Sequence, residues 1–241
     1  MIHRESKVPY YYQLYEILRQ KIASGEWKPG DLLPSESDLL DQYRVSRSTV
    51  RQALDMLVNS GHIYRQRGRG TFVAHPTIEQ SLSRIISFTD EMRQRGMTPH
   101  TEVLARALVP APEDIAAFLR VEPGEELARL ERLRMADGEP MSIEESYLVH
   151  RFCPGVLSHD YASVPLRDVL VNVYGLRWAY AKQTIRAISA PEKIAEKLSV
   201  RPKVALLYIE RTSFIDQNIP VEFIRFYHRG DRYVLYNELQ G

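Results

Sequence analysis

Six arginines and a single acidic residue, Asp55, lie between Arg44 and Gly70, although the 241-residue chain has a formal net charge of only +1. Clustered arginine suits an anionic partner, because a guanidinium group forms paired hydrogen bonds with phosphate and with the guanine edge. The same cluster is also compatible with a solvated arginine-rich face. Charge alone therefore leaves both interpretations open, and the surrounding elements must decide between them.

A second set of charged residues lies in strand-like segments in the middle of the chain. Arg132 and Arg134 are two residues apart and therefore point to the same face of a strand. A three-residue loop at 137–139 would place Arg132 opposite Glu144 and Arg134 opposite Ser142, whereas a two-residue loop would place them on opposite faces. The first pairing builds a polar floor for an anionic, hydroxyl-rich ligand. The alternative is a solvated sheet face with a weak cross-strand ion pair.

Three helices followed by a hairpin are predicted to position the arginines between Arg44 and Gly70. Ser35 can cap the second helix, with Asp38 completing a capping box, and Ser46 can cap the third. Helices are expected at 11–22, 35–43 and 46–59, followed by strands at 63–65 and 71–73. This order predicts a winged helix-turn-helix. The alternative is a three-helix protein-binding domain with a basic loop.

The amino-terminal end of the third helix is suited to DNA. It carries partial positive charge and free backbone N–H groups, which favour phosphate, and its small hydroxyl residues allow close approach to a major groove. Glycines in the wing leave its arginines free to enter a minor groove or lie on the backbone. The predicted DNA-binding residues are Ser35, Glu36, Ser46, Arg47, Ser48, Thr49, Arg51, Arg67, Gly68, Arg69, Gly70 and Thr71.

Three ordered blocks carry a specific resemblance. Leu33–Glu36, Val45–Leu54 and Gly68–Val73 resemble the signatures of the GntR family of bacterial transcription regulators, and the match covers residues 8–75. The resemblance implies DNA contacts by the residues that match the family's own contacts: Arg47, Ser48, Thr49, Arg51, Arg69 and Gly70. One departure is Ser37, where the family usually has arginine. The operator preference of the family is therefore not carried over.

A boundary is expected near residue 75, where His75-Pro76-Thr77 precedes a polar segment without periodicity. We expect a DNA-binding domain at 1–74, a linker at 75–82 and a second domain at 83–241. In the second domain, helices are expected at 88–95, 112–119, 166–174 and 191–198, and strands at 100–109, 127–135, 141–148, 180–188, 204–215 and 219–228. This pattern predicts an α+β sandwich with helices packed against an antiparallel sheet.

The second domain also carries a resemblance. Ser87–Met92 with Arg95–Pro99, the pair Arg132 and Arg134, and Arg229–Tyr233 resemble the UTRA effector domain of the HutC branch of GntR regulators, from about residue 80 to the C-terminus. The resemblance implies a chorismate-lyase-like fold that senses a small molecule instead of catalysing a reaction.

Relatives of that branch that bind amino-sugar phosphates imply roles for individual residues. The site at 87–89 would supply backbone N–H groups to phosphate, Arg132 and Arg134 would bind the anion, and Glu144 and Glu222 would orient the sugar. The chain departs at 164–167, where relatives have Ser-x-Tyr, so Arg167 is expected to replace a lost contact. His228 stands where some relatives have tyrosine. The predicted effector-binding residues are Ser87, Phe88, Thr89, Arg132, Arg134, Glu144, Arg167, Glu222 and His228.

Several classes of protein are excluded by the remaining features. A single cysteine, Cys153, excludes an internal disulfide and a cysteine-rich zinc site. The longest apolar run, Val204–Ile209, is far shorter than a membrane span, and the N-terminus has no signal-peptide core. The seven histidines show no metal-ligand spacing, and no catalytic motif is present. We therefore expect a cytoplasmic protein that needs no metal or cofactor.

Together these features predict a ligand-responsive transcription regulator, most simply a repressor. An isolated winged helix reads only a half-site, so we expect a homodimer on palindromic double-stranded operator DNA. The expected effector is a small anionic metabolite, with a sugar phosphate or amino-sugar phosphate favoured. Two alternatives stay open: a chorismate-lyase-like enzyme with an accessory winged-helix domain, and an effector-independent DNA-binding protein.

Overall fold

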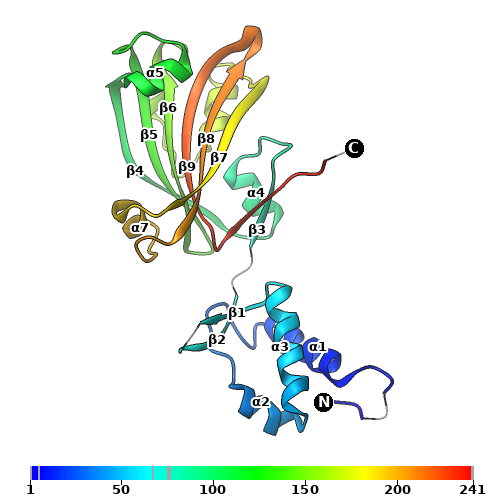
Figure 1. Ribbon diagram of the computed structural model, residues 1–241. Helices are drawn as coiled ribbons and strands as arrows, with labels where there is room; N and C mark the ends of the chain where they lie inside the picture. The colour runs from blue at the N-terminus through cyan, green and yellow to red at the C-terminus, as the bar shows by residue number, and fades with distance from the viewer. Residues whose placement is uncertain (1, 5, 67, 75–76, 240–241) are drawn as a thin grey trace. The chain divides into compact units, whose positions relative to one another are not determined.

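The computed structural model describes residues 2–4, 6–66, 68–74 and 77–239. The chain divides into two compact units, Met1–Thr77 and Ile78–Gly241 (Figure 1). Each unit has a buried apolar core of its own. No helix in the described part of the chain is long and apolar enough to cross a membrane.

The first unit is a winged helix-turn-helix. It consists of α1 (Tyr10–Ala23), α2 (Glu36–Tyr43), α3 (Arg47–Asn59), β1 (Ile63–Gln66) and β2 (Gly70–Val73). The two strands pair antiparallel and form the wing. Apolar side chains at helical spacing meet in a core whose fully buried members are Leu14, Leu18, Leu39, Val50, Leu54, Leu57, Ile63 and Val73. The prediction of this architecture is confirmed.

Capping residues fix where the second and third helices begin. The Asp38 amide donates to Ser35 Oγ at 3.2 Å, and the Ser35 amide donates to the Asp38 carboxylate at 3.0 Å, which completes the capping box. The Thr49 amide donates to Ser46 Oγ at 3.2 Å. Between them, Arg44 ends α2 in the left-handed conformation, with φ of 51°, and turns the chain into α3. Arg44 therefore forms the tight corner of the helix-turn-helix.

The second unit is built on a six-stranded antiparallel sheet. Its strands follow the order β4 (Pro99–Pro110), β5 (Glu126–Ala136), β6 (Glu139–Val149), β9 (Ile219–Arg229), β8 (Ala205–Ile215) and β7 (Tyr180–Ser189). All five pairs of neighbours are antiparallel. The prediction of an α+β domain with an antiparallel sheet is confirmed.

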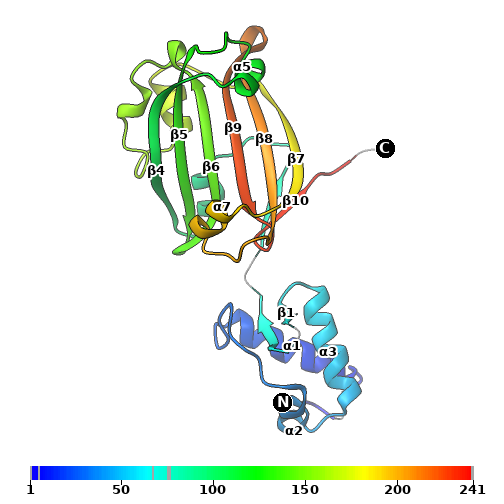
Figure 2. The same cartoon turned by 60° about the vertical axis from the view of Figure 1, so that its left-hand side comes forward.

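Helices cover both faces of this sheet. The helices are α4 (Phe88–Gln94), α5 (Glu113–Leu119), α6 (Leu166–Asn172) and α7 (Glu192–Lys197). Tyr147 packs with the α5 cluster, whereas its neighbour Leu148 packs with the α6 cluster. Consecutive strand residues point to opposite faces, so α5 and α6 lie on opposite sides of the sheet. Figure 2 shows α5 and α7 over one face. The other face, with α4 and α6, is the one that holds the cavity described below.

The turn between β5 and β6 differs from the expected one. Ala136 pairs with Glu139, so the turn has only two residues, Asp137 and Gly138. Both have positive φ. A bulge at Met141 then shifts the pairing by one residue. Arg132 therefore lies opposite Glu144 and Arg134 opposite Ser142, as predicted for the longer loop. The pairing prediction is confirmed although the three-residue loop on which it depended is wrong.

Part of the expected linker is a strand. Residues 78–81 form β3 (Ile78–Ser81), which pairs in parallel with β10 (Tyr233–Tyr236) near the C-terminus. The Ile78 side chain is buried with Phe88 and Met92. The pairing partner of β3 lies about 155 residues further along the chain. No local pattern in the segment 77–84 therefore indicates the strand. Residues 75 and 76 lie outside the described residues.

Candidate DNA-binding surface and effector site

The start of α3 presents hydroxyl and guanidinium groups on the surface. Ser46 Oγ lies 2.8 Å from both Ser48 Oγ and Thr49 Oγ1. Arg47, Ser48 and Arg51 are exposed, because Val50 and Ala53 take the buried side of the helix. This arrangement leaves the positive end of α3 free to meet an anionic surface.

The two helices of the motif are joined at this surface by an ion pair. Arg51 Nε lies 3.5 Å from the Glu36 carboxylate at the start of α2. The pair is exposed, so Arg51 can leave Glu36 and bind a DNA phosphate or base edge at little cost in free energy. The structure thus brings the predicted residues Ser35 and Glu36 beside Arg51.

The wing carries the other predicted DNA-binding residues. Gly68 and Gly70 have φ of 74° and 121°, conformations that favour glycine. A Cβ at Gly70 would also lie 2.6 Å from the Leu32 side chain. Arg69 and Gly70 are exposed and Thr71 is partly buried. The predicted contact Arg67 lies outside the described residues.

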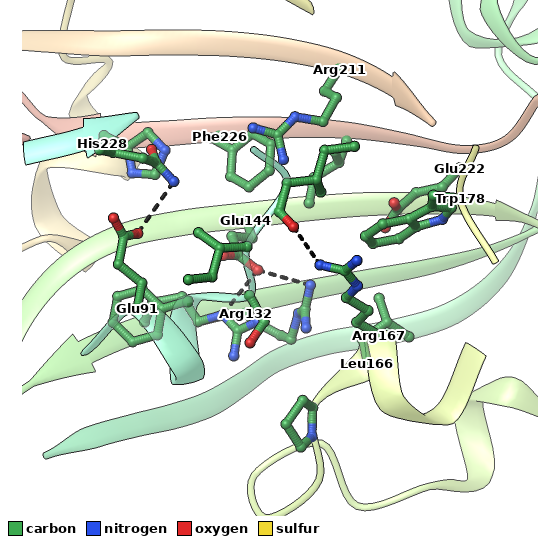
Figure 3. Close-up of a pocket in the computed structure, with 18 of the residues that line it drawn as sticks. Glu91, Arg132, Glu144, Leu166, Arg167, Trp178, Arg211, Glu222, Phe226 and His228 are labelled. Atoms are coloured by element: carbon green, nitrogen blue, oxygen red, sulfur yellow. Dashed lines mark hydrogen bonds and ion pairs between the residues drawn. The ribbon is translucent and has the colours of Figure 1, made fainter. Parts of the chain in front are cut away.

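The second unit contains a cavity of about 70 Å³, counted as the volume open to the centres of water-sized molecules (Figure 3). Strands β5, β6, β8 and β9 supply its floor, and α4, α6 and the segment before α4 surround it. Eight of the nine predicted effector-binding residues line it: Ser87, Phe88, Arg132, Arg134, Glu144, Arg167, Glu222 and His228. Thr89 is not among the lining residues.

Glu144 binds two arginines on the floor of the cavity. Its carboxylate lies 2.8 Å from an Arg132 nitrogen and 2.9 Å from Arg134 Nε. All three side chains are buried, with exposed fractions of 2%, 5% and 5% for Arg132, Arg134 and Glu144. Helices and loops cover this face, so the alternative of a solvated ion pair is wrong. Two cations sharing one carboxylate leave this cluster with a positive charge.

Burial dominates the electrostatics of the floor. Burial, and then the neighbouring charge of Arg134, lowers the pKa of Arg132 to about 10, so Arg132 is still cationic at neutral pH. Burial would raise the pKa of Glu144, but the charges of Arg134 and Arg132 outweigh it and lower that pKa. The Glu222 carboxylate accepts a hydrogen bond from Ser213 at 3.1 Å, and burial raises its pKa.

Aromatic rings enclose the end of the cavity at His228. The imidazole is stacked on Phe226, with ring centroids 5.3 Å apart, and lies 4.2 Å from the ring of Tyr233. Burial lowers the pKa of His228 to about 4, so the ring is neutral near pH 7. Its buried Nδ1 has no hydrogen-bond partner among the described residues. His228 can therefore hydrogen-bond a ligand without adding charge.

Arg167 lies at the start of α6 on the opposite side of the cavity. It donates a hydrogen bond of 2.5 Å to the Ile85 carbonyl, and its guanidinium lies 5.0 Å from the centroid of the Trp178 ring. Ser87 caps α4, where its hydroxyl accepts from the Asp90 amide. The structure thus brings together residues that are far apart in the sequence.

Comparison with known proteins supports this description at the level of the whole chain. Residues 10–73 match the model of bacterial regulatory proteins of the gntR family, and residues 94–234 match the UTRA domain. The HTH-type transcriptional repressor NagR of Bacillus subtilis (strain 168) is 35% identical over 232 residues, which cover 96% of this chain and 95% of NagR. The chain belongs to the GntR family. Its combination of domains is that of the HutC-type regulators.

Two further GntR-type relatives extend the comparison. The crystal structure of PhnF from Mycobacterium smegmatis matches with a TM-score of 0.71 and 26% identity, covering 97% of this chain and 100% of PhnF. The mannosyl-D-glycerate transport/metabolism system repressor MngR of Escherichia coli (strain K12) is 35% identical over 140 residues, 58% of each chain. GntR regulators bind DNA and effector metabolites, and these relatives are transcription regulators, not enzymes.

Five charged or polar lining residues escape the sequence-based prediction: Gln80, Glu91, Trp178, Arg211 and Tyr233. The sequence pattern of the β8–β9 hairpin could have identified Arg211 as a lining residue. In the hairpin of β8 and β9, Ser213 pairs with Glu222, so Arg211, two residues before Ser213, shares a face with Glu222. Trp178 had no such signal, because it lies in the loop before β7 and reaches the cavity only through the tertiary fold.

Proposed function

We propose that this GntR-family chain is a transcriptional repressor controlled by a small anionic metabolite. The observation that carries the proposal is the buried Arg132–Glu144–Arg134 cluster, which places a net positive charge on the floor of the cavity. A buried cationic site is costly unless an anion compensates it. Sugar phosphates and amino-sugar phosphates are the favoured effectors, because Glu144 and Glu222 can accept from or donate to sugar hydroxyl and amino groups.

The relatives support this class of effector. MngR is named as the repressor of a mannosyl-D-glycerate system, and mannosyl-D-glycerate is a sugar bearing a carboxylate. A ligand of this chemistry presents both the hydroxyl groups and the negative charge that the cavity of this chain suits.

DNA is bound by a homodimer in this proposal. One winged helix reads one half-site, so two copies related by a two-fold axis require a palindromic operator. Such a repressor acts in the bacterial cytoplasm, on the nucleoid while it is bound to DNA. The effector changes operator affinity only if it binds one arrangement of the dimer better than the other.

The experiment is a thermal-shift screen of the full chain with phosphorylated sugars, amino-sugar phosphates and organic acids. Each hit is retested for its effect on binding to a DNA fragment selected from genomic DNA. We expect hits among the phosphorylated sugars, and Arg132→Ala should abolish the shift. The matched control is Arg186→Ala, which removes an exposed arginine from β7. Normal binding of the hit by Arg132→Ala, or no hits at all, would overturn the assignment of the cavity.

A further inference from the structure

The positive charge of the cavity is divided between two places. Four arginines line it: Arg132, Arg134, Arg167 and Arg211. On the floor, Glu144 compensates half of the charge of Arg132 and Arg134. Arg167 and Arg211 form no ion pair with any carboxylate in the described part of the chain. The less compensated charge therefore lies at Arg167 and Arg211, and not at the Arg132–Glu144–Arg134 cluster.

Neutral partners hold these two arginines in place. Arg211 donates to the Gln183 side-chain carbonyl at 2.9 Å, and its guanidinium lies 4.8 Å from the centroid of the Phe226 ring. Arg167 donates to the Ile85 carbonyl and lies over Trp178. Each guanidinium has further N–H donors beyond these bonds. Both groups are thus oriented and still able to bind an anion.

The acidic residues nearby do not supply that anion. Glu91 is bound elsewhere, since it accepts from Gln80 at 3.2 Å and lies 3.4 Å from Arg95, which does not line the cavity. Glu222 accepts from Ser213 at 3.1 Å and forms no ion pair with Arg211 in the described part of the chain. Burial, and to a lesser degree the neighbouring charge of Arg167, lowers the pKa of Arg211 against the opposing charges of the nearby carboxylates.

Trp178 lines the same part of the cavity and carries a third donor. Trp178 Nε1 is buried and has no hydrogen-bond partner among the residues that the structure describes. Trp178, Arg167 and Arg211 line both the cavity and a neighbouring groove, which also contains Ile85 and Gln183. They therefore lie where the cavity meets the groove, whereas Arg132 and Arg134 line only the cavity.

We propose that Arg167, Arg211 and Trp178 form a second anion-binding subsite, and that the effector carries two separate anionic groups, one for each subsite. A sugar that bears a phosphate at one end and a carboxylate or second phosphate at the other has this chemistry. The inference rests on the proposed function, because it assigns the ligand class of the same cavity. It differs from the proposed function in requiring two anionic groups instead of one.

Crystals of the full chain soaked in selenate test the two subsites directly, because selenium gives an anomalous signal. We expect one peak beside Arg132 and Arg134 and a second beside Arg167 and Arg211. Arg211→Gln should lose only the second peak, Arg211→Lys should keep it, and the surface control Arg186→Gln should keep both. A single peak at Arg132 and Arg134 overturns the second subsite and leaves the proposed function intact. No peak in the cavity contradicts both, and peaks unchanged by Arg211→Gln identify an adventitious ion only.

Calorimetric titration tests the ligand class with three matched probes: glucose 6-phosphate, gluconate and 6-phosphogluconate. We expect 6-phosphogluconate, which has both anionic groups, to bind at least tenfold more tightly than either singly anionic probe. Arg211→Gln should remove this preference, whereas Arg186→Gln should retain it. Equal affinities for 6-phosphogluconate and glucose 6-phosphate, or no binding of any probe, would overturn the claim of a doubly anionic effector.

Discussion

The floor of the cavity carries a net positive charge, because the single carboxylate of Glu144 is shared by two buried arginines. A buried pair of one acid and one base would be neutral and would hold no further anion. The three-residue cluster retains one positive charge, and Arg132 also donates to Ser146 at 3.3 Å and Arg134 to Thr101 at 2.6 Å. The arginines are therefore pre-oriented, so an effector loses little free energy in ordering them.

His228 should make stability depend on pH. Its folded-state pKa is about 4 and its ordinary value is 6.5, so below pH 6.5 the unfolded chain binds a proton that the folded chain does not. The stability contributed by neutral His228 is present above pH 6.5 and is lost as pH falls toward 4. We expect the free energy of unfolding of the wild type to fall more steeply than that of His228→Gln, by about 1 kcal/mol per pH unit. Urea unfolding between pH 4.5 and 7.5 measures this, and parallel curves would contradict it.

Arg51 should contribute to operator binding directly. It lies at the exposed start of α3, and its ion pair with Glu36 is easily exchanged. We expect Arg51→Ala to weaken operator binding by about 1–3 kcal/mol, the range for loss of a paired base contact. Arg19→Ala is the control, because Arg19 is a surface arginine on α1 paired with Glu16 at 2.9 Å. Fluorescence anisotropy at several salt concentrations measures both, and an unchanged affinity for Arg51→Ala would place the DNA elsewhere.

At the scale of the elements, the turn between β5 and β6 sets the pairing that brings Arg132 to Glu144. Gly138 has φ of 81°, where a Cβ is strained. We expect Gly138→Ala to lower the free energy of unfolding by about 1 kcal/mol. Glu102→Ala, at an exposed position on β4, should have little effect. Equal stabilities in urea unfolding would show that the turn does not constrain this hairpin.

The sequence predicts those elements whose signals are local. Caps at Ser35 and Ser46 and apolar spacing locate α2 and α3, and alternation locates β5 and β6. The pairing of β3 with β10 escapes prediction, because it joins segments about 155 residues apart. The bulge at Met141 escapes prediction because it changes the pairing by one residue without changing the length of the turn.

The same distinction holds for the candidate site. Arg132, Arg134 and Glu144 lie on adjacent strands, so their pairing follows from one hairpin. Trp178 reaches the cavity from a loop whose course depends on the whole second unit, and nothing in its neighbourhood in the sequence indicates this.

For the whole molecule, the proposed binding to a palindromic operator requires two copies of the chain. A single chain has a mass of 27.9 kDa and a single wing and α3. We expect sedimentation equilibrium at micromolar concentration to give twice that mass, about 56 kDa, since a two-fold axis is what matches a palindrome. Footprinting should protect two equal half-sites separated by about one helical turn or a multiple of it. A monomer that protects one half-site would contradict the dimer.

The proposed function requires that effector binding by the second unit and operator binding by the first unit are coupled, and such coupling is reciprocal. If the effector changes operator affinity by some factor, the operator changes effector affinity by the same factor. The most direct measurement is operator affinity of the full chain with and without a saturating hit from the screen, for the wild type and for Arg132→Ala. We predict a change of at least tenfold, about 1.4 kcal/mol, for the wild type and none for the variant. An operator affinity of the wild type that stays the same while the ligand is demonstrably bound would contradict the account.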